Sequence, residues 1–266
     1  MVAQLRSEAS NGKSKMPDDQ PIVLEYEAAG ASDQGRTRKS NEDAYGLNLN
    51  NPEGACNFVV CDGMGGAAAG EIASRMAVDA MLSAMSQGDL TLDSFQDAVG
   101  AANHRVHRSA AQDPSRAGMG TTLVAMATRG THAWVAHVGD SRCYRFRNSH
   151  LERLTLDHSL VDEQVRLGQL TPAQAETSPM RNVITRAVGT QDQVDADLID
   201  FEVVSGDLYL LASDGLMREV NDDRIAGILR DAGNLEETCS QLIAAANEAG
   251  GHDNITCVLV RAVVRA

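Results

Sequence analysis

Hydrophobic positions along the chain alternate between two patterns. Short runs rich in β-branched residues predict strands over 22–29, 57–61, 121–127, 132–138, 143–147, 208–212 and 255–264. Between these runs, alanine-rich stretches with apolar residues at helical spacing predict helices over 69–86, 92–112, 223–231 and 235–248. Thr91 or Asp93 could cap the second helix, and Asn234 the last.

The order of these elements indicates the fold class. The helices come in pairs between groups of strands, which favours antiparallel sheets covered by helix pairs, a layered α+β fold, over a doubly wound parallel sheet. A turn at Arg129-Gly130 joins two strands into a predicted hairpin. Residues 158–178 are polar and helical, with Gly168 and Pro172 as interruptions, and predict a surface flap. Residues 1–20 lack periodicity and predict a disordered tail.

Composition restricts the class of protein further. Apolar residues make up 43 % of the 266 residues, enough for a core without disulfides in one large domain or two small ones. None of the five cysteines forms a C-x-x-C pair, so buried thiols in a reducing compartment are expected. We find no long apolar span or secretory leader and expect a cytoplasmic protein without membrane insertion. The formal charge of −14 argues against binding to nucleic acid.

Aspartates recur where predicted strands end. Each lies beside glycine or another small polar residue: Asp62, Asp140, Asp214 and Asp253. One Asp-Gly pair is more often a turn than a ligand, but four such positions suggest a single convergent site. Crowded carboxylates repel each other, and a divalent cation would relieve that repulsion. Ligation by oxygen alone points to Mg²⁺ or Mn²⁺ rather than zinc.

A guanidinium precedes this series. Arg38 lies five positions before Asp43, and its planar fork suits a pair of phosphate oxygens, although a solvated charge cluster is the simpler interpretation of this segment alone. The glycine-rich loop after Asp62 lacks the Lys and Ser/Thr of a P-loop and the spacing of a dinucleotide site.

Six motifs in series resemble a known family. They are Arg38 with Asn41-Glu42-Asp43, Asp62-Gly63-Met64-Gly65-Gly66, Met119-Gly120-Thr121-Thr122, Gly139-Asp140-Ser141-Arg142, Ser213-Asp214-Gly215 and Gly251-His252-Asp253-Asn254. Together, over about 28–264, they resemble the PPM family of metal-dependent protein phosphatases (type 2C) in its compact bacterial form. The resemblance implies a four-layer sandwich of two antiparallel sheets flanked by helix pairs. It implies one phosphatase domain over 21–266, with the flap at about 158–178.

The resemblance also implies roles for individual residues. Asp62 would be shared by two Mn²⁺ or Mg²⁺ ions, the carbonyl of Gly63 would join one ion, and Asp214 and Asp253 the other. Asp43 with Glu42 would act on the first ion largely through water, and Asn254 would support the ligands. Asp140 with Asp214 would form a third, weaker metal site. Arg38 would hold the substrate phosphate.

The implied activity is hydrolysis of phosphoserine and phosphothreonine in proteins by metal-activated water, without a covalent phosphoenzyme. Phosphorylated proteins would be the substrates, a Ser/Thr kinase the opposing partner, and the enzyme a monomer. Met64 departs from the animal pattern, where a histidine at this place is proposed as the acid for the leaving group; His158 and His252 are better explained structurally. Two rival hypotheses are a catalytically inactive relative that binds phosphoproteins and a hydrolase of small phosphate esters or nucleotides.

Overall fold

The computed structural model describes residues 23–49, 54–65, 69–86 and 89–265, so the predicted tail and Gly66 lie outside the described residues. In chain order the elements are β1 (Leu24–Asp33), β2 (Asp43–Asn48), β3 (Ala55–Met64), α1 (Ala69–Met85), α2 (Leu92–Gln112), η1 (Pro114–Arg116), β4 (Gly120–Thr121), β5 (Leu123–Arg129), β6 (His132–Val138), β7 (Arg142–Arg147), β8 (His150–Arg153), α3 (Leu160–Arg166), α4 (Pro172–Glu176), β9 (Asp197–Glu202), β10 (Leu208–Ala212), α5 (Asp214–Met217), α6 (Asp222–Arg230), α7 (Leu235–Ala249) and β11 (Ile255–Val264).

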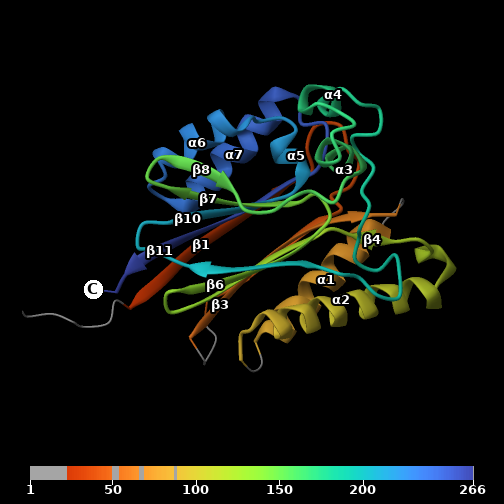
Figure 1. Cartoon of the computed structure of the whole chain (residues 1–266), viewed down its shortest axis with the longest axis horizontal. Coiled ribbons are helices and arrows are strands. Elements are labelled where there is room, and N and C mark those ends of the chain that lie inside the picture. Colours follow the sequence, from red (N-terminus) through yellow and green to blue (C-terminus); the bar gives the residue numbers. More distant parts are fainter. Residues whose placement is uncertain (1–22, 50–53, 66–68, 87–88, 266) are drawn as a thin grey trace, which may run out of the picture.

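Two antiparallel sheets face each other and form the centre of the molecule. One sheet has the strand order β1-β11-β10-β7-β8, and the other has the order β2-β3-β5-β6-β9, with β4 paired to β3. Helices α6 and α7 cover the outer face of the first sheet, and α1 and α2 cover that of the second (Figure 1). The predicted four-layer α+β sandwich is confirmed, and so is the hairpin, since β5 pairs with β6 around Gly130.

Strand β3 shows why the central strands are continuous apolar runs. Phe58 and Val60 face the other sheet, whereas Val59 and Cys61 face α1 and α2, and all four side chains are fully buried. Successive side chains of a strand point to opposite faces, so a strand covered on both faces needs apolar residues at every position.

Capping residues fix the helix ends that the sequence indicated. Thr91 caps the start of α2. Its hydroxyl accepts a hydrogen bond from the Ser94 amide at 3.0 Å, and the Ser94 hydroxyl accepts one from the Thr91 amide. Asn234 caps α7 by accepting from the amides of Glu236 and Glu237. Each such cap contributes on the order of 1 kcal/mol.

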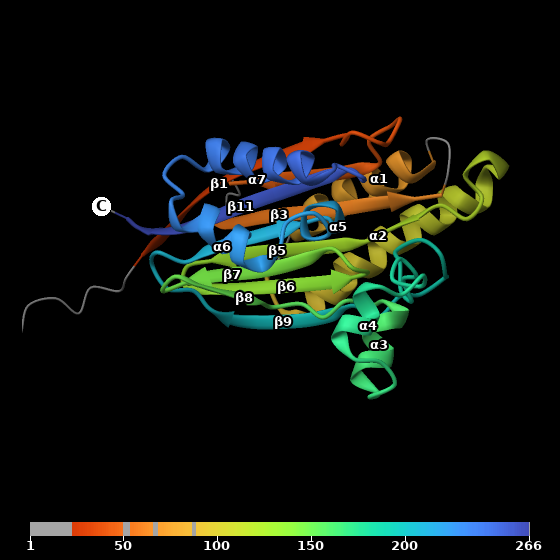
Figure 2. The ribbon, with the colours of Figure 1, turned by 90° about the horizontal axis from the view of Figure 1, so that it is seen from above.

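The flap contains α3 and α4, which project from one end of the sandwich (Figure 2). It leaves the first sheet after β8 and returns to the second sheet at β9. No helix among the described residues is both long and apolar enough to cross a membrane.

Candidate metal and phosphate site

Strand pairing brings the predicted acidic residues together. The register of β2 against β3 places Asp43 opposite Asp62. Asp214 follows β10, and Asp253 lies just before β11. These two strands are neighbours in the other sheet. A cavity of about 300 Å³ is lined by most of the predicted site residues, namely Arg38, Glu42, Asp62, Gly63, Asp140, Asp214 and Asp253. Residues far apart in the sequence therefore face one space.

Hydrogen bonds to the backbone hold Asp62 in place. Its amide donates to the Thr122 hydroxyl at 2.9 Å, and its carbonyl accepts from the Thr122 amide at 2.9 Å and the Thr121 hydroxyl at 2.9 Å. The Thr122 hydroxyl lies 2.7 Å from that of Ser141, beside Asp140. These residues leave the Asp62 carboxylate free to face the cavity.

Gly63 is enclosed so tightly that no side chain fits. A Cβ at this position would lie 2.0 Å from the Gly70 carbonyl oxygen and 2.6 Å from that of Glu42. The Gly63 amide also donates to the Glu42 carbonyl at 3.1 Å. Close packing of α1 and of the residue before β2 against the end of β3 therefore requires glycine at position 63.

Asp43 is a buried carboxylate with only one oxygen satisfied. Oδ2 accepts from the Ser213 hydroxyl at 2.7 Å, whereas Oδ1 is buried without a hydrogen-bond partner among the described residues. Burial raises the pKa of Asp43 to about 7, and repulsion from Asp214 and Asp253 adds to the shift. Oδ1 of Asp214 is likewise buried and unpartnered.

The pKa values of Asp62 and Asp140 are raised for the same reasons. Burial and repulsion from Asp43 raise the pKa of Asp62, and burial and repulsion from Asp214 raise that of Asp140 to about 7. Buried carboxylates of this kind are stable either protonated or beside a cation. Carboxylate oxygens without a hydrogen-bond partner, in a site whose donors are all oxygens, fit a hard divalent ion such as Mg²⁺ or Mn²⁺.

Arg38 reaches the same space from the segment between β1 and β2. Its guanidinium lies 2.8 Å from Oδ2 of Asp253, and the side chain is half exposed. Asn254 anchors the segment, because its amide group donates to the carbonyls of Gln34 and Ser40 and accepts from the Glu42 amide at 2.9 Å. Asn254 therefore positions the segment that carries Arg38 and Glu42.

One charged contact of the cluster was missed in the sequence. Arg218, the residue after α5, has its guanidinium against the Asp214 carboxylate and 3.5 Å from Oδ2 of Asp140. The spacing of four between Asp214 and Arg218 is the usual distance for an ion pair on a helix, and it could have indicated this contact.

A histidine anchors the flap to the loop that carries Asp140. The His158 amide donates to the Gly139 carbonyl at 2.7 Å, and the Gly139 amide donates to Nδ1 of His158 at 3.2 Å. On the return side of the flap, the Thr185 amide donates to the His158 carbonyl at 2.7 Å. Asn182 and Ile184, also on that side, line the 300 Å³ cavity. The structural role expected for His158 agrees with these contacts.

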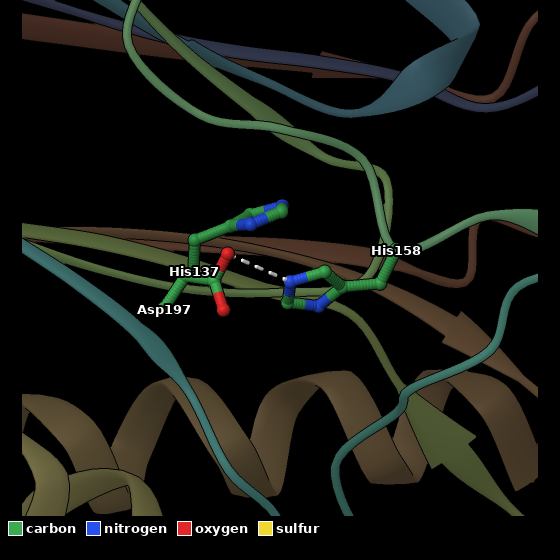
Figure 3. Close-up of side chains that lie close together, drawn as sticks. All are labelled: His137, His158 and Asp197. Carbon is green, nitrogen blue, oxygen red and sulfur yellow. Dashed lines mark ion pairs between the residues drawn. The ribbon is translucent and has the colours of Figure 1, made fainter. Parts of the chain in front are cut away.

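His137, His158 and Asp197 form a second cluster that has the composition of a metal site (Figure 3). Nδ1 of His158 accepts from Gly139, so the neutral ring carries its proton on Nε2, which lies 3.2 Å from Asp197. Arg186 adds a positive charge 2.9 Å from Asp197. Burial lowers the pKa of His137 to about 3 and keeps it neutral. The proton on Nε2 and the adjacent cation oppose metal binding, so we interpret the cluster as support for the flap.

Asp157 is a second charged residue to which no sequence pattern pointed. Its carboxylate is buried and accepts hydrogen bonds from Arg142 at 2.7 Å and from Arg153 at 2.6 Å. Burial opposes its ionisation, but the hydrogen bonds and charges of these arginines outweigh burial and lower the pKa of Asp157. Both arginines line a larger cavity of about 1120 Å³ beside the flap, where Asp157 compensates their charge. His252, which lines this cavity, pairs with Glu219 at 2.7 Å.

Comparisons with known proteins agree with this arrangement. The family model described as Protein phosphatase 2C matches residues 32–259. Protein phosphatase PhpP of Streptococcus pneumoniae is 38 % identical over 236 residues, which cover 86 % of this chain and 94 % of that protein. The serine/threonine phosphatase PstP/Ppp of Mycobacterium tuberculosis superposes with a TM-score of 0.83 at 34 % identity, covering 92 % of this chain and 100 % of that chain. A structure of the PstP catalytic domain in complex with two manganese ions gives a TM-score of 0.82 at 34 % identity, covering 91 % of this chain and 100 % of that chain.

Proposed function

The chain belongs to the protein phosphatase 2C family, and from this premise we propose that it removes phosphate from phosphoserine and phosphothreonine in other proteins. The observation that carries the proposal is the group of buried aspartates at one cavity, with unpartnered oxygens on Asp43 and Asp214 and a guanidinium at the rim. A group of carboxylates like this one can serve catalysis when it binds hard cations next to a phosphate ester.

The proposed metal ligands are those that the family resemblance implies, and all of them except Asp43 line the cavity. Asp62 would hold two ions together, with the Gly63 carbonyl as a further ligand of one ion and Asp214 and Asp253 as further ligands of the other. Asp43 and Glu42 would act on the first ion through water, since Asp43 is buried and does not line the cavity. When bound, the two ions supply an activated water as nucleophile and neutralise charge on the phosphoryl oxygens. The manganese bound in PstP supports this choice of metal.

Side chains of the chain itself orient the substrate. Arg38 is half exposed and can turn from Asp253 toward two oxygens of a phosphate. Met64 lines the cavity but its thioether has no proton to donate, so the leaving group takes its proton from elsewhere. Burial raises the pKa of the Cys61 thiol next to Asp62. A thiol in that state is a poor nucleophile, which supports hydrolysis without a covalent phosphoenzyme.

The biological setting is also part of the proposal. A Ser/Thr kinase is the expected opposing partner, and the protein is a cytoplasmic monomer. All five cysteines are unpaired and buried, which is consistent with a reducing compartment. One phosphatase domain over 21–266 is supported by the pairing of the first strand with the last, in which Leu24 lies opposite Val264.

Removal of metal tests the proposed activity. Purified protein should release phosphate from a phosphoserine peptide in Mn²⁺, lose that activity to background in excess EDTA, and regain it when Mn²⁺ is restored. Nucleotides at the same concentrations serve as the comparison. Turnover that persists in EDTA would contradict the metal mechanism. A clear preference for nucleotides would contradict the substrate class, and no turnover under any condition would favour an inactive relative.

Replacement of Arg38 should separate substrate binding from metal binding. Arg38→Ala removes a phosphate contact but no metal ligand, so we expect a roughly tenfold or greater rise in KM, about 1.4 kcal/mol. Mn²⁺ affinity should stay the same or rise, because the positive charge 2.8 Å from Asp253 is lost. Arg38→Lys keeps the charge and should give a smaller rise in KM. Steady-state kinetics and calorimetric titration with Mn²⁺ measure the two quantities. An unchanged KM in Arg38→Ala would remove this residue from the phosphate site.

A further inference from the structure

Arg218 occupies a position between two acids of the candidate site. Its backbone amide donates to the Asp214 carbonyl at 2.9 Å, which places residue 218 one helical turn after Asp214. In the side chain, the guanidinium nitrogen Nη2 contacts Oδ2 of Asp214 and also lies 3.5 Å from Oδ2 of Asp140. Nη1 lies 3.7 Å from Oδ2 of Asp253. One guanidinium thus joins three of the cavity's carboxylates.

Asp140 and Asp214 are the pair to which the family resemblance gave a third, weaker metal ion. In this chain a positive charge already lies between them. A guanidinium carries a permanent charge, and a divalent ion entering the same position would be repelled at close range. The residues at this position therefore do not fit a third ion.

The orientation of Asp214 allows Arg218 and the two proposed ions to coexist. Arg218 contacts Oδ2, whereas Oδ1 of Asp214 is buried and has no partner among the described residues. The second oxygen thus remains available as a metal ligand on the other side of the carboxylate. Neutralising Asp140 and Asp214 with Arg218 therefore leaves Oδ1 of Asp214 for the two-ion centre.

We propose that Arg218 is a built-in cation that replaces the third metal ion, so that the site holds two exchangeable divalent ions and no more. This inference rests on the proposed metal-dependent phosphatase function. Arg218 is a positioning residue: it neutralises and orients Asp140 and Asp214. The positive charge between these two aspartates therefore does not depend on the metal concentration, because a side chain, unlike a bound ion, cannot dissociate.

Counting bound Mn²⁺ tests this inference without reference to activity. The free ion is followed by electron paramagnetic resonance during titration of the wild-type protein and Arg218→Gln, both checked for folding by circular dichroism. The wild type should bind two ions. Arg218→Gln should gain a third, at least tenfold tighter than any further binding to the wild type, because Asp140 and Asp214 lose their counter-charge.

Matched variants locate the extra ion. Arg218→Lys keeps a positive charge and should remain at two ions. Arg181→Gln removes the same charge from an exposed arginine just after the flap that lines the larger cavity, and it should also remain at two. Adding Asp140→Asn to Arg218→Gln should abolish the third ion.

Three outcomes overturn the inference. They are a third ion of comparable affinity in the wild type, an unchanged count of two in folded Arg218→Gln, or the same gain in Arg181→Gln. The wild-type count alone decides the first outcome, even if the variants fail to fold. Failure of the proposed function looks different: the wild-type protein would bind no Mn²⁺ at this cluster at all.

Discussion

Asp62→Asn is expected to lower phosphatase turnover about 10³-fold or more, equivalent to roughly 4 kcal/mol of transition-state stabilisation. The substitution keeps the size of the side chain but removes the charge of the ligand that we propose both ions share. Mn²⁺ affinity, measured by calorimetric titration, should fall with the activity. The change is one of function and not of folding, because Thr121 and Thr122 hold residue 62 through its backbone.

Stability measurements distinguish this explanation from misfolding. Burial and repulsion from the neighbouring acids raise the pKa of Asp62, so removing its charge relieves the metal-free protein. In EDTA, Asp62→Asn should therefore melt at the same temperature as the wild type or higher. Asp79→Asn, the same substitution at an exposed position of α1, should keep full turnover. Normal activity in Asp62→Asn would remove this residue from the metal centre.

Asp157→Ala should have the largest effect on folding. The substitution leaves Arg142 and Arg153 without the carboxylate that both of them contact, and removing one partner of a buried ion cluster costs about 3–5 kcal/mol. Urea unfolding at neutral pH measures the loss. Glu152→Ala breaks the more exposed pair with Arg145 and should cost less than about 1 kcal/mol. A similarly small loss for Asp157→Ala would show that the arginines find other partners or water.

The sequence predicts all the strands in the interior of the two sheets, and one edge strand, β1. Predicted and observed bounds coincide for β6, β10 and β11, which lie inside the two sheets. The three strands that the prediction missed, β2, β8 and β9, are all at sheet edges. Strand β9 has no fully buried residue, and its last four residues alternate between partly buried and exposed, so it lacks a continuous apolar run.

The same limit explains which site residues could be anticipated. Aspartates that follow apolar runs can be found because the strand itself indicates where each carboxylate goes. Arg218 follows a helix of only four residues, too short to show periodicity. The partners of Asp157 lie on β7 and at the end of β8, and β8 was not predicted. The ion pairs of Asp157 therefore depend on tertiary packing, which one sequence does not display.

Crystals grown with Mn²⁺ and measured at the manganese absorption edge test the central claim most directly. The account predicts two anomalous peaks in the 300 Å³ cavity, both in contact with Asp62 and one of them also with Asp214 and Asp253. Crystals with full manganese in the buffer and no anomalous peak at these aspartates would contradict it.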